Sequence, residues 1–161
     1  MPVNVNVTSN LDEVIAIYNA APEKFNRRMR AMQTAVLLVE RTVKKLTPVN
    51  TGALRSSMGH EIRFVGAEFQ GVVGTSKAYA PYVELGTRPH WPPVAPIRYW
   101  VQRKLKLTGA DLERVTFLVR RKIALVGTQG ARMFQQAFEQ TQAQIIKMWD
   151  DIWGEAIEKD L

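Results

Sequence analysis

Cysteine is absent from the 161-residue sequence. A chain without cysteine has no disulfide framework, no thiolate zinc site and no thiol nucleophile, so nothing in it demands an oxidising compartment. Apolar runs of the roughly 20 residues that span a bilayer are missing as well. The first ten residues also lack the positive region and apolar core of a secretion signal. We therefore expect neither secretion nor membrane insertion.

Groups with the chemistry of an active site are scarce. The two histidines, His60 and His90, have no carboxylate at metal-ligand spacing, and no Cys/His cluster or HExxH motif is present. The segment GVVGTSK lacks the Gly-Lys pair of a phosphate-binding loop, and no GxSxG motif occurs. Glu84 is a single carboxylate without a partner acid, base or metal. The sequence therefore predicts a protein that is not an enzyme and that needs no cofactor or metal ion.

Positive charge is what the chain has in excess. Its net charge is +7, and its isoelectric point is about 9.9. Such a surplus suggests attraction to nucleic acid or to an acidic protein face. The length fits a single domain over residues 1–161. No internal repeat or low-complexity tract divides the chain.

The first half of the chain predicts a helix packed on a small sheet. Valines alternate with polar residues in 1–10, which indicates an N-terminal arm or edge strand. From Pro22 to Leu46, apolar residues recur at alternating spacings of four and three, the pattern of a long amphipathic helix. Residues 58–65 and 69–75 read as a β-hairpin, with the second strand near the middle of a small sheet. We expect these elements to form a helix-sheet core over residues 11–93.

The second half predicts helices. A proline-rich connector is expected to place Trp91 in a pocket, with a polyproline recognition motif as the alternative. A helical hairpin should follow within 94–130, its helices spanning 97–126. Residues 131–161 predict a long C-terminal helix with an apolar stripe wide enough for partners on two sides. The predicted fold class is therefore α+β: a long amphipathic helix, a small antiparallel sheet with a hairpin, an inserted helical hairpin and a long C-terminal helix.

The stretch from Thr47 to Thr87 begins TPVNTGALRSSM and closes with GVVGTSKAYAPYVELGT. Followed by a PP pair and by ARMFQQAF, it resembles the tail-completion or minor tail-component family of long-tailed double-stranded DNA bacteriophages. The resemblance is carried by Thr51, Gly52, Leu54, Arg55, Tyr79, Ala80, Val83, Glu84, Gly86 and Thr87, and by Phe134 with Ala137 in the last helix. Compact members of this family have a shorter link where Pro93 to Gly130 stands here, so the helical hairpin looks like an insertion.

The resemblance implies a non-enzymatic virion protein of the neck, assembled in the host cytoplasm. Such a protein would complete the tail and join it to the head as a ring, a hexamer, around the DNA exit channel. Its partners would be further copies of itself and the head-closure, tail-terminator and tail-tube proteins, with non-specific contact to double-stranded DNA. The alternative within this setting is a tail terminator ring that stops tail-tube polymerisation. A second class of function is a small basic DNA-binding regulator that uses the helices of 97–126. A third class, a nuclease, is not supported, because the sequence has no acidic cluster that could bind a metal ion.

Charged side chains are the candidates for contacts to DNA or to other subunits. The basic candidates are Arg27, Arg28, Arg30, Arg41, Lys44 and Lys45 on the long helix, and Arg120, Arg121 and Lys122 on the helical hairpin. A solvated helix face is the alternative for the first group. The acidic candidates are Asp150, Asp151, Glu155 and Glu158. This asymmetry fits two independently solvated faces, but it also suits head-to-tail contacts in which one protomer's acidic end meets the next protomer's basic hairpin.

Overall fold

The structure is a computed structural model that describes residues 15–16, 18–65 and 68–158, with side chains described as far as Asp151. The chain groups into two compact units. Unit 1 comprises Met1–Leu46, Ser56–Ser76 and Phe134–Leu161, and unit 2 comprises Thr47–Arg55 and Lys77–Met133. The arm expected in residues 1–10 lies outside the described residues. The single domain expected from the chain length stays a prediction.

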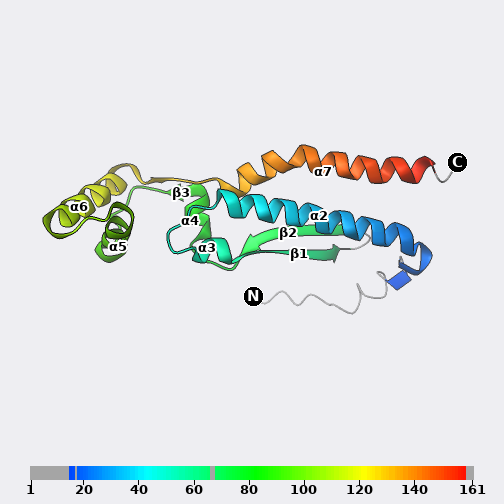
Figure 1. Ribbon diagram of the computed structural model, residues 1–161, viewed down its shortest axis with the longest axis horizontal. Helices are drawn as coiled ribbons and strands as arrows, with labels where there is room; N and C mark the ends of the chain where they lie inside the picture. Colours follow the sequence, from blue (N-terminus) through cyan, green and yellow to red (C-terminus); the bar gives the residue numbers. More distant parts are fainter. Residues whose placement is uncertain (1–14, 17, 66–67, 159–161) are drawn as a thin grey trace. The chain divides into compact units, whose positions relative to one another are not determined.

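Unit 1 is built on a helix that lies along a β-hairpin (Figure 1). The helix α2 (Pro22–Leu46) packs against both β1 (Met58–Val65) and β2 (Glu68–Thr75). The strands are antiparallel, with Met58 opposite Thr75 and Val65 opposite Glu68. Pro22 suits the first turn of a helix because its missing N–H has no partner there. The predicted amphipathic helix and hairpin are therefore confirmed.

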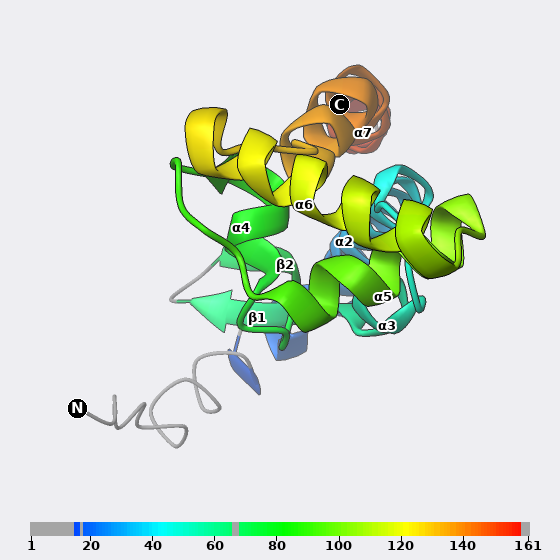
Figure 2. The ribbon, with the colours of Figure 1, turned by 90° about the vertical axis from the view of Figure 1, so that its left-hand side faces the viewer.

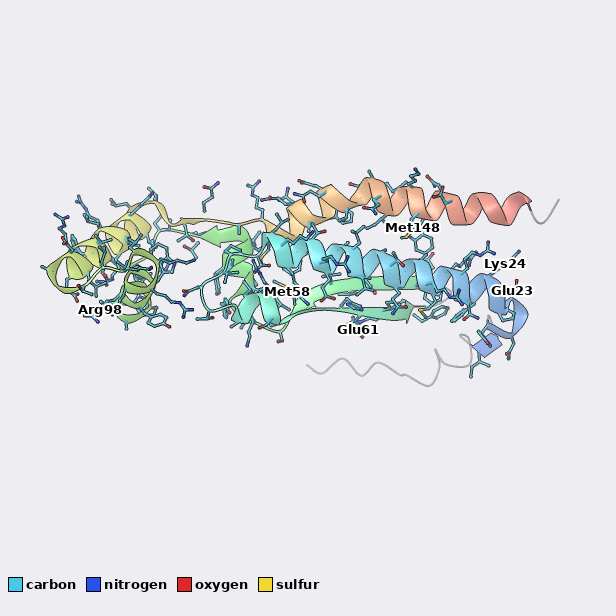
Figure 3. The ribbon with its side chains drawn as sticks, viewed as in Figure 1. Glu23, Lys24, Met58, Glu61, Arg98 and Met148 are labelled. Atoms are coloured by element: carbon cyan, nitrogen blue, oxygen red, sulfur yellow. The ribbon has the colours of Figure 1, made fainter. Side chains whose placement is uncertain are left out.

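One face of the hairpin is apolar and the other is polar. Alternate residues of β1 point to opposite faces, so Ile62 and Phe64 share the covered face and are half-buried. The rings of Phe25, Phe64 and Phe69 form a cluster with centroid distances of 5.1–6.3 Å. Glu61 lies on the other face and points away from α2 (Figure 3). The sheet has two strands in the described part of the chain, so β2 is an edge strand there rather than a middle one.

A charged cluster joins α2 to β1. The Glu40 carboxylate binds the Lys44 ammonium, one helical turn later, and the Nδ1 atom of His60 on β1. The hydrogen bonds from Lys44 and His60 stabilise the ionised carboxylate, so they lower the pKa of Glu40 below its usual value. This cluster ties the C-terminal half of the helix to the start of the hairpin.

The C-terminal helix α7 (Met133–Glu158) confirms the predicted long helix. It buries Ala137 and Thr141, which are four residues apart and so lie on one face. The Thr141 hydroxyl donates to the carbonyl of Ala137 at 2.8 Å, which satisfies this buried polar group. None of the helices in the described residues is long and apolar enough to cross a membrane.

Unit 2 contains short elements and a helical hairpin. The short elements are α3 (Ala53–Ser56), α4 (Ala80–Leu85), β3 (Gly86–Thr87) and β4 (Thr128–Gln129). The hairpin consists of α5 (Val94–Leu105) and α6 (Gly109–Val126), which pack on one another (Figure 2). Val101 and Leu112 are fully buried in it, and Lys106 ends α5 in the left-handed conformation. The predicted helical hairpin and the α+β class are confirmed.

Candidate functional site

The motif residues fall in two segments, 51–55 and 79–87, and both segments lie in unit 2. Leu54 of the first segment and Ala80 of the second are buried, as is Thr47 just before the first. Arg55 Nη2 donates to the carbonyl of Thr47 at 3.2 Å, and this hydrogen bond connects the two ends of the loop before α3. Thr51 Oγ1 accepts from the amide of Ala53 at 3.4 Å, where it caps the start of α3. These contacts stabilise the fold of the segment.

The second segment is held by the chain that returns from the helical hairpin. The amide of Ala131 donates to the carbonyl of Val83 at 2.8 Å, and the amide of Arg132 donates to the carbonyl of Glu84 at 3.0 Å. Thr87 and Thr128 are opposite each other in β3 and β4, and their hydroxyls are 2.9 Å apart. Both ends of the hairpin therefore leave from one narrow two-stranded ribbon, residues 86–87 and 128–129.

Three glycines make this ribbon narrow enough. A Cβ at Gly127 would lie 2.0 Å from the carbonyl oxygen of Thr87, and one at Gly86 would lie 2.1 Å from that of Thr128. Gly130 approaches the carbonyl of Glu84 in the same way. Gly86 and Gly127 also have positive φ angles, +82° and +73°, which side chains other than glycine rarely adopt. Gly86 pairs with Gln129, a contact that the sequence did not predict.

A pocket of about 550 Å³ lies between the two motif segments. Its lining includes Leu54, Tyr79 and Val83 from the motifs, and Trp100 and Lys104 from α5. Lys104 and the Tyr79 hydroxyl are the ionisable side chains of this lining. In the described residues, no group of three His, Cys, Asp or Glu side chains could hold a metal ion. The arrangement suits packing and binding.

A second pocket, of about 630 Å³, lies on the outer side of the second motif. It is formed by α4 and the segment that follows, from Pro81 to His90, and its walls are mostly apolar. Leu85 is 80% exposed and Tyr82 is 65% exposed at this place. Side chains of this size exposed together mark surfaces that bind other proteins.

Trp91 lies on the outside of α6 and not in a pocket as expected. Its ring is 6.5 Å from that of Phe117 and 5.4 Å from the guanidinium of Arg120, and it remains 58% exposed. Arg120 Nε also donates to the carbonyl of Pro92 at 2.9 Å. The buried residue of the connector is Pro92. Arg120 therefore fixes the connector to α6, whereas Arg121 and Lys122 are exposed.

The six basic candidates on α2 differ in their surroundings. Arg30, Arg41 and Lys45 are exposed, whereas the other three are half-buried, namely Arg27, Arg28 and Lys44. The exposed members are available to a partner, and at 100° per residue they lie on one side of the helix.

Asp150 and Asp151, the acidic candidates whose side chains are described, point in different directions from α7. Asp151 and Met148 line a pocket of about 650 Å³ together with Arg41 of α2. Met148 lies on the side of α7 that faces α2 (Figure 3). Asp150 is exposed, as is Glu139, which the sequence had not singled out. The side chains of Glu155 and Glu158 lie outside the described residues.

Comparison with known proteins gives one match. Residues 5–86, about half of the chain, match the HK97-gp10-like family, described as "Bacteriophage HK97-gp10, putative tail-component". The match includes both motif segments apart from Thr87, and it ends before α5. Searches among curated proteins and among solved structures find no match.

Proposed function

Because the chain belongs to the HK97-gp10-like family of bacteriophage tail components, we propose that it is a structural protein of the phage neck. In this proposal the protein completes the tail and joins it to the head. It forms a ring, a hexamer, around the channel through which DNA leaves. Its partners are further copies and the head-closure, tail-terminator and tail-tube proteins, which it meets in the host cytoplasm before it becomes part of the virion.

The observation that supports this proposal best is the apolar surface that unit 2 leaves exposed. Tyr82 and Leu85 are exposed beside the second motif, and Leu125 and Val126, each 67% exposed, end α6. A protein that acts alone seldom leaves so many large apolar side chains in water, because their burial against a partner is favourable. An assembly component would cover them when its neighbours bind.

In this proposal the protein is not an enzyme and uses no cofactor. The motif residues hold loops and helices together, as the buried Leu54 and Ala80 do. The chemistry that the described surfaces offer is apolar contact and charge.

Contact with DNA forms the second part of the proposal. Residues 94–126 contain eight lysines and arginines against two acidic residues, a net charge of +6 within a chain of net +7. Exposed cations attract phosphates without regard to sequence, and salt weakens the attraction. Diffuse contacts of this kind suit a channel that DNA must pass through, and purified protein should bind unrelated duplexes with equal, weak affinity.

Deletion of the gene from the phage genome tests the function. We expect electron micrographs of the lysate to show filled heads and tails of normal length that are not joined. Tails of uncontrolled length would indicate a tail terminator in place of a neck protein. Joined, infectious particles would refute both roles.

Complementation with two variants tests the apolar surface. Leu85→Gln should fold normally, because Leu85 is 80% exposed, yet it should fail to restore joined particles. Val65→Gln is the matched control, since Val65 is 57% exposed on the hairpin of unit 1. Full complementation by Leu85→Gln would remove the support that this surface gives.

A further inference from the structure

We propose that α7 of one copy docks on α6 of a second copy, through two exposed faces that are both apolar and opposite in charge. The inference rests on the proposed ring and identifies the two surfaces that close it. It depends on the exposed side chains of each helix, described separately below.

The outer face of α6 combines large apolar side chains with cations. Phe117, Leu118 and Leu125 are at least half exposed, and Arg114 and Arg121 are exposed among them. At 100° per residue these five side chains fall on one side of the helix, within about a third of its circumference. The opposite side carries the buried Leu112 and Thr116.

The outer face of α7 is apolar as well, but its charges are negative. Phe138 and Ile146 are 57% and 50% exposed, and they are two turns apart. The exposed carboxylates Glu139 and Asp150 lie on the same side, while Ala137 and Thr141 are buried on the other. Glu139 and Asp150 therefore supply the negative charge beside the apolar side chains of this face, whereas Asp151 lines the pocket with α2.

The two faces fit each other better than either fits DNA. Phosphates would neutralise Arg114 and Arg121, but they would leave Phe117, Leu118 and Leu125 in water. A helix that brings Phe138 and Ile146 together with two carboxylates covers the leucines and pairs the arginines. Complementary charge also sets the choice of partner and speeds encounter.

The contact is heterologous, because each copy offers a different surface to each neighbour. An interface of this type generates a closed ring when the rotation between copies is a whole fraction of a turn. A second copy of the chain is therefore the occupant of the α6 face.

Charge reversal with mixing tests the contact. One variant carries Arg114→Glu and Arg121→Glu, and the other carries Glu139→Arg and Asp150→Arg. Each variant alone should self-associate at least about a hundredfold more weakly than the wild type, because like charges then meet. An equimolar mixture should regain the association, since every contact between unlike variants again joins opposite charges. Analytical ultracentrifugation measures all three samples.

Matched controls show whether the position of the charge matters. Arg103→Glu changes an exposed arginine on α5, and Gln140→Arg adds a charge to an exposed position on the other side of α7. Both should associate like the wild type. Reversed variants that associate normally, or a mixture that stays dissociated, would overturn the proposed contact.

Cross-linking gives a second measurement with milder substitutions. The chain has no cysteine, so Leu118→Cys and Ile146→Cys proteins each carry one thiol. A bismaleimide should join them in the mixture and should join neither protein to itself. Gln102→Cys, exposed on α5, replaces Leu118→Cys as the control. Lack of a cross-link in the mixture overturns the contact, whereas joined particles without the gene would refute the neck function and leave the contact intact.

Discussion

Gly71 lets α2 approach β2, so alanine at this position should destabilise unit 1. A Cβ at residue 71 would lie 2.4 Å from Val36 Cγ1 and 2.7 Å from Met32 Sδ, well inside the contact distance of about 3.5 Å. The methionine can move, but Val36 is only 4% exposed and is held in the core. Overpacking costs about 1–3 kcal/mol. The restricted unfolded chain offsets about 0.4–1 kcal/mol of this, which leaves a net loss of about 1–2 kcal/mol.

Gly74→Ala is the control within the same strand. A Cβ at residue 74 would meet no atom within 4 Å, so the effect on the unfolded chain remains alone. We expect this variant to be neutral or up to about 1 kcal/mol more stable than the wild type. Urea unfolding followed by far-UV circular dichroism gives the free energy of unfolding, and an unchanged slope shows that both variants unfold in the same way.

A double-mutant cycle assigns the cost to the contact with Val36. Val36→Ala removes the nearer methyl group and should relieve the clash, so Gly71→Ala should cost about 1 kcal/mol less in that background. Equal stabilities of Gly71→Ala and Gly74→Ala would refute the close approach. Additive effects in the double variant would refute the role of Val36.

Five further substitutions, at Gly127, Gly52, Glu40 and Arg120, test unit 2 and the charged cluster of unit 1. Gly127→Ala should lower the free energy of unfolding, measured in urea, by at least about 2 kcal/mol, because the positive φ and the nearby carbonyl both oppose a Cβ. Gly52→Ala is the control: Gly52 has a φ of +87° but no atom near its Cβ position, so this variant should lose only about 1 kcal/mol. Glu40→Gln should cost about 1 kcal/mol or less at pH 7. The lysine and histidine partners lower the folded-state pKa of Glu40 from 4.5. The carboxylate therefore contributes to the free energy of unfolding above pH 4.5, and this contribution is lost as the pH falls through the folded-state pKa. A stability difference between wild type and variant that persists in strong acid would contradict this. Arg120→Ala should lower the free energy of unfolding by about 1–2 kcal/mol and expose the connector at Trp91 to proteolysis. Arg120→Lys should retain part of this stability. Unchanged cleavage of Arg120→Ala would contradict the contact.

The long elements could be predicted because their signal is local. In α2 the apolar spacings of four and three follow directly from 3.6 residues per turn, and Pro22 and Leu46 bound the helix as expected. The β-hairpin of β1 and β2 could be predicted for the same reason, since its two strands are separated by a short loop. The need for glycine at residue 71 was not, because it depends on which helix residues lie above the strand.

The glycine ribbon of unit 2 could not be predicted for a different reason. Two-residue strands have no periodicity, and Thr87 pairs with Thr128, 41 residues later in the chain. The available signal was Gly127-Thr128-Gln129-Gly130 itself: glycines on either side of two residues that can pair with Gly86-Thr87.

The direction of each cation on α6 also depended on tertiary contacts. Arg120, Arg121 and Lys122 were expected to act alike, but successive residues on a helix point about 100° apart. The packing of α5 on α6 sets the rotation of the helix, and it turns Arg120 toward Trp91. Sequence alone identifies the cluster, and only the packing separates its structural member from its exposed ones.

The family match and the compact units divide the chain differently, and this difference bears on function. The match ends at Gly86, yet the motif residues Leu54, Tyr79 and Val83 line one pocket with Trp100 and Lys104 of α5. Motif residues of the matched segment therefore face α5 of the unmatched helical hairpin across this pocket. Three glycines allow the close approach of the two strands, β3 and β4, that connect the two parts. The charge and the exposed leucines of α6 therefore lie outside the segment that matches the family.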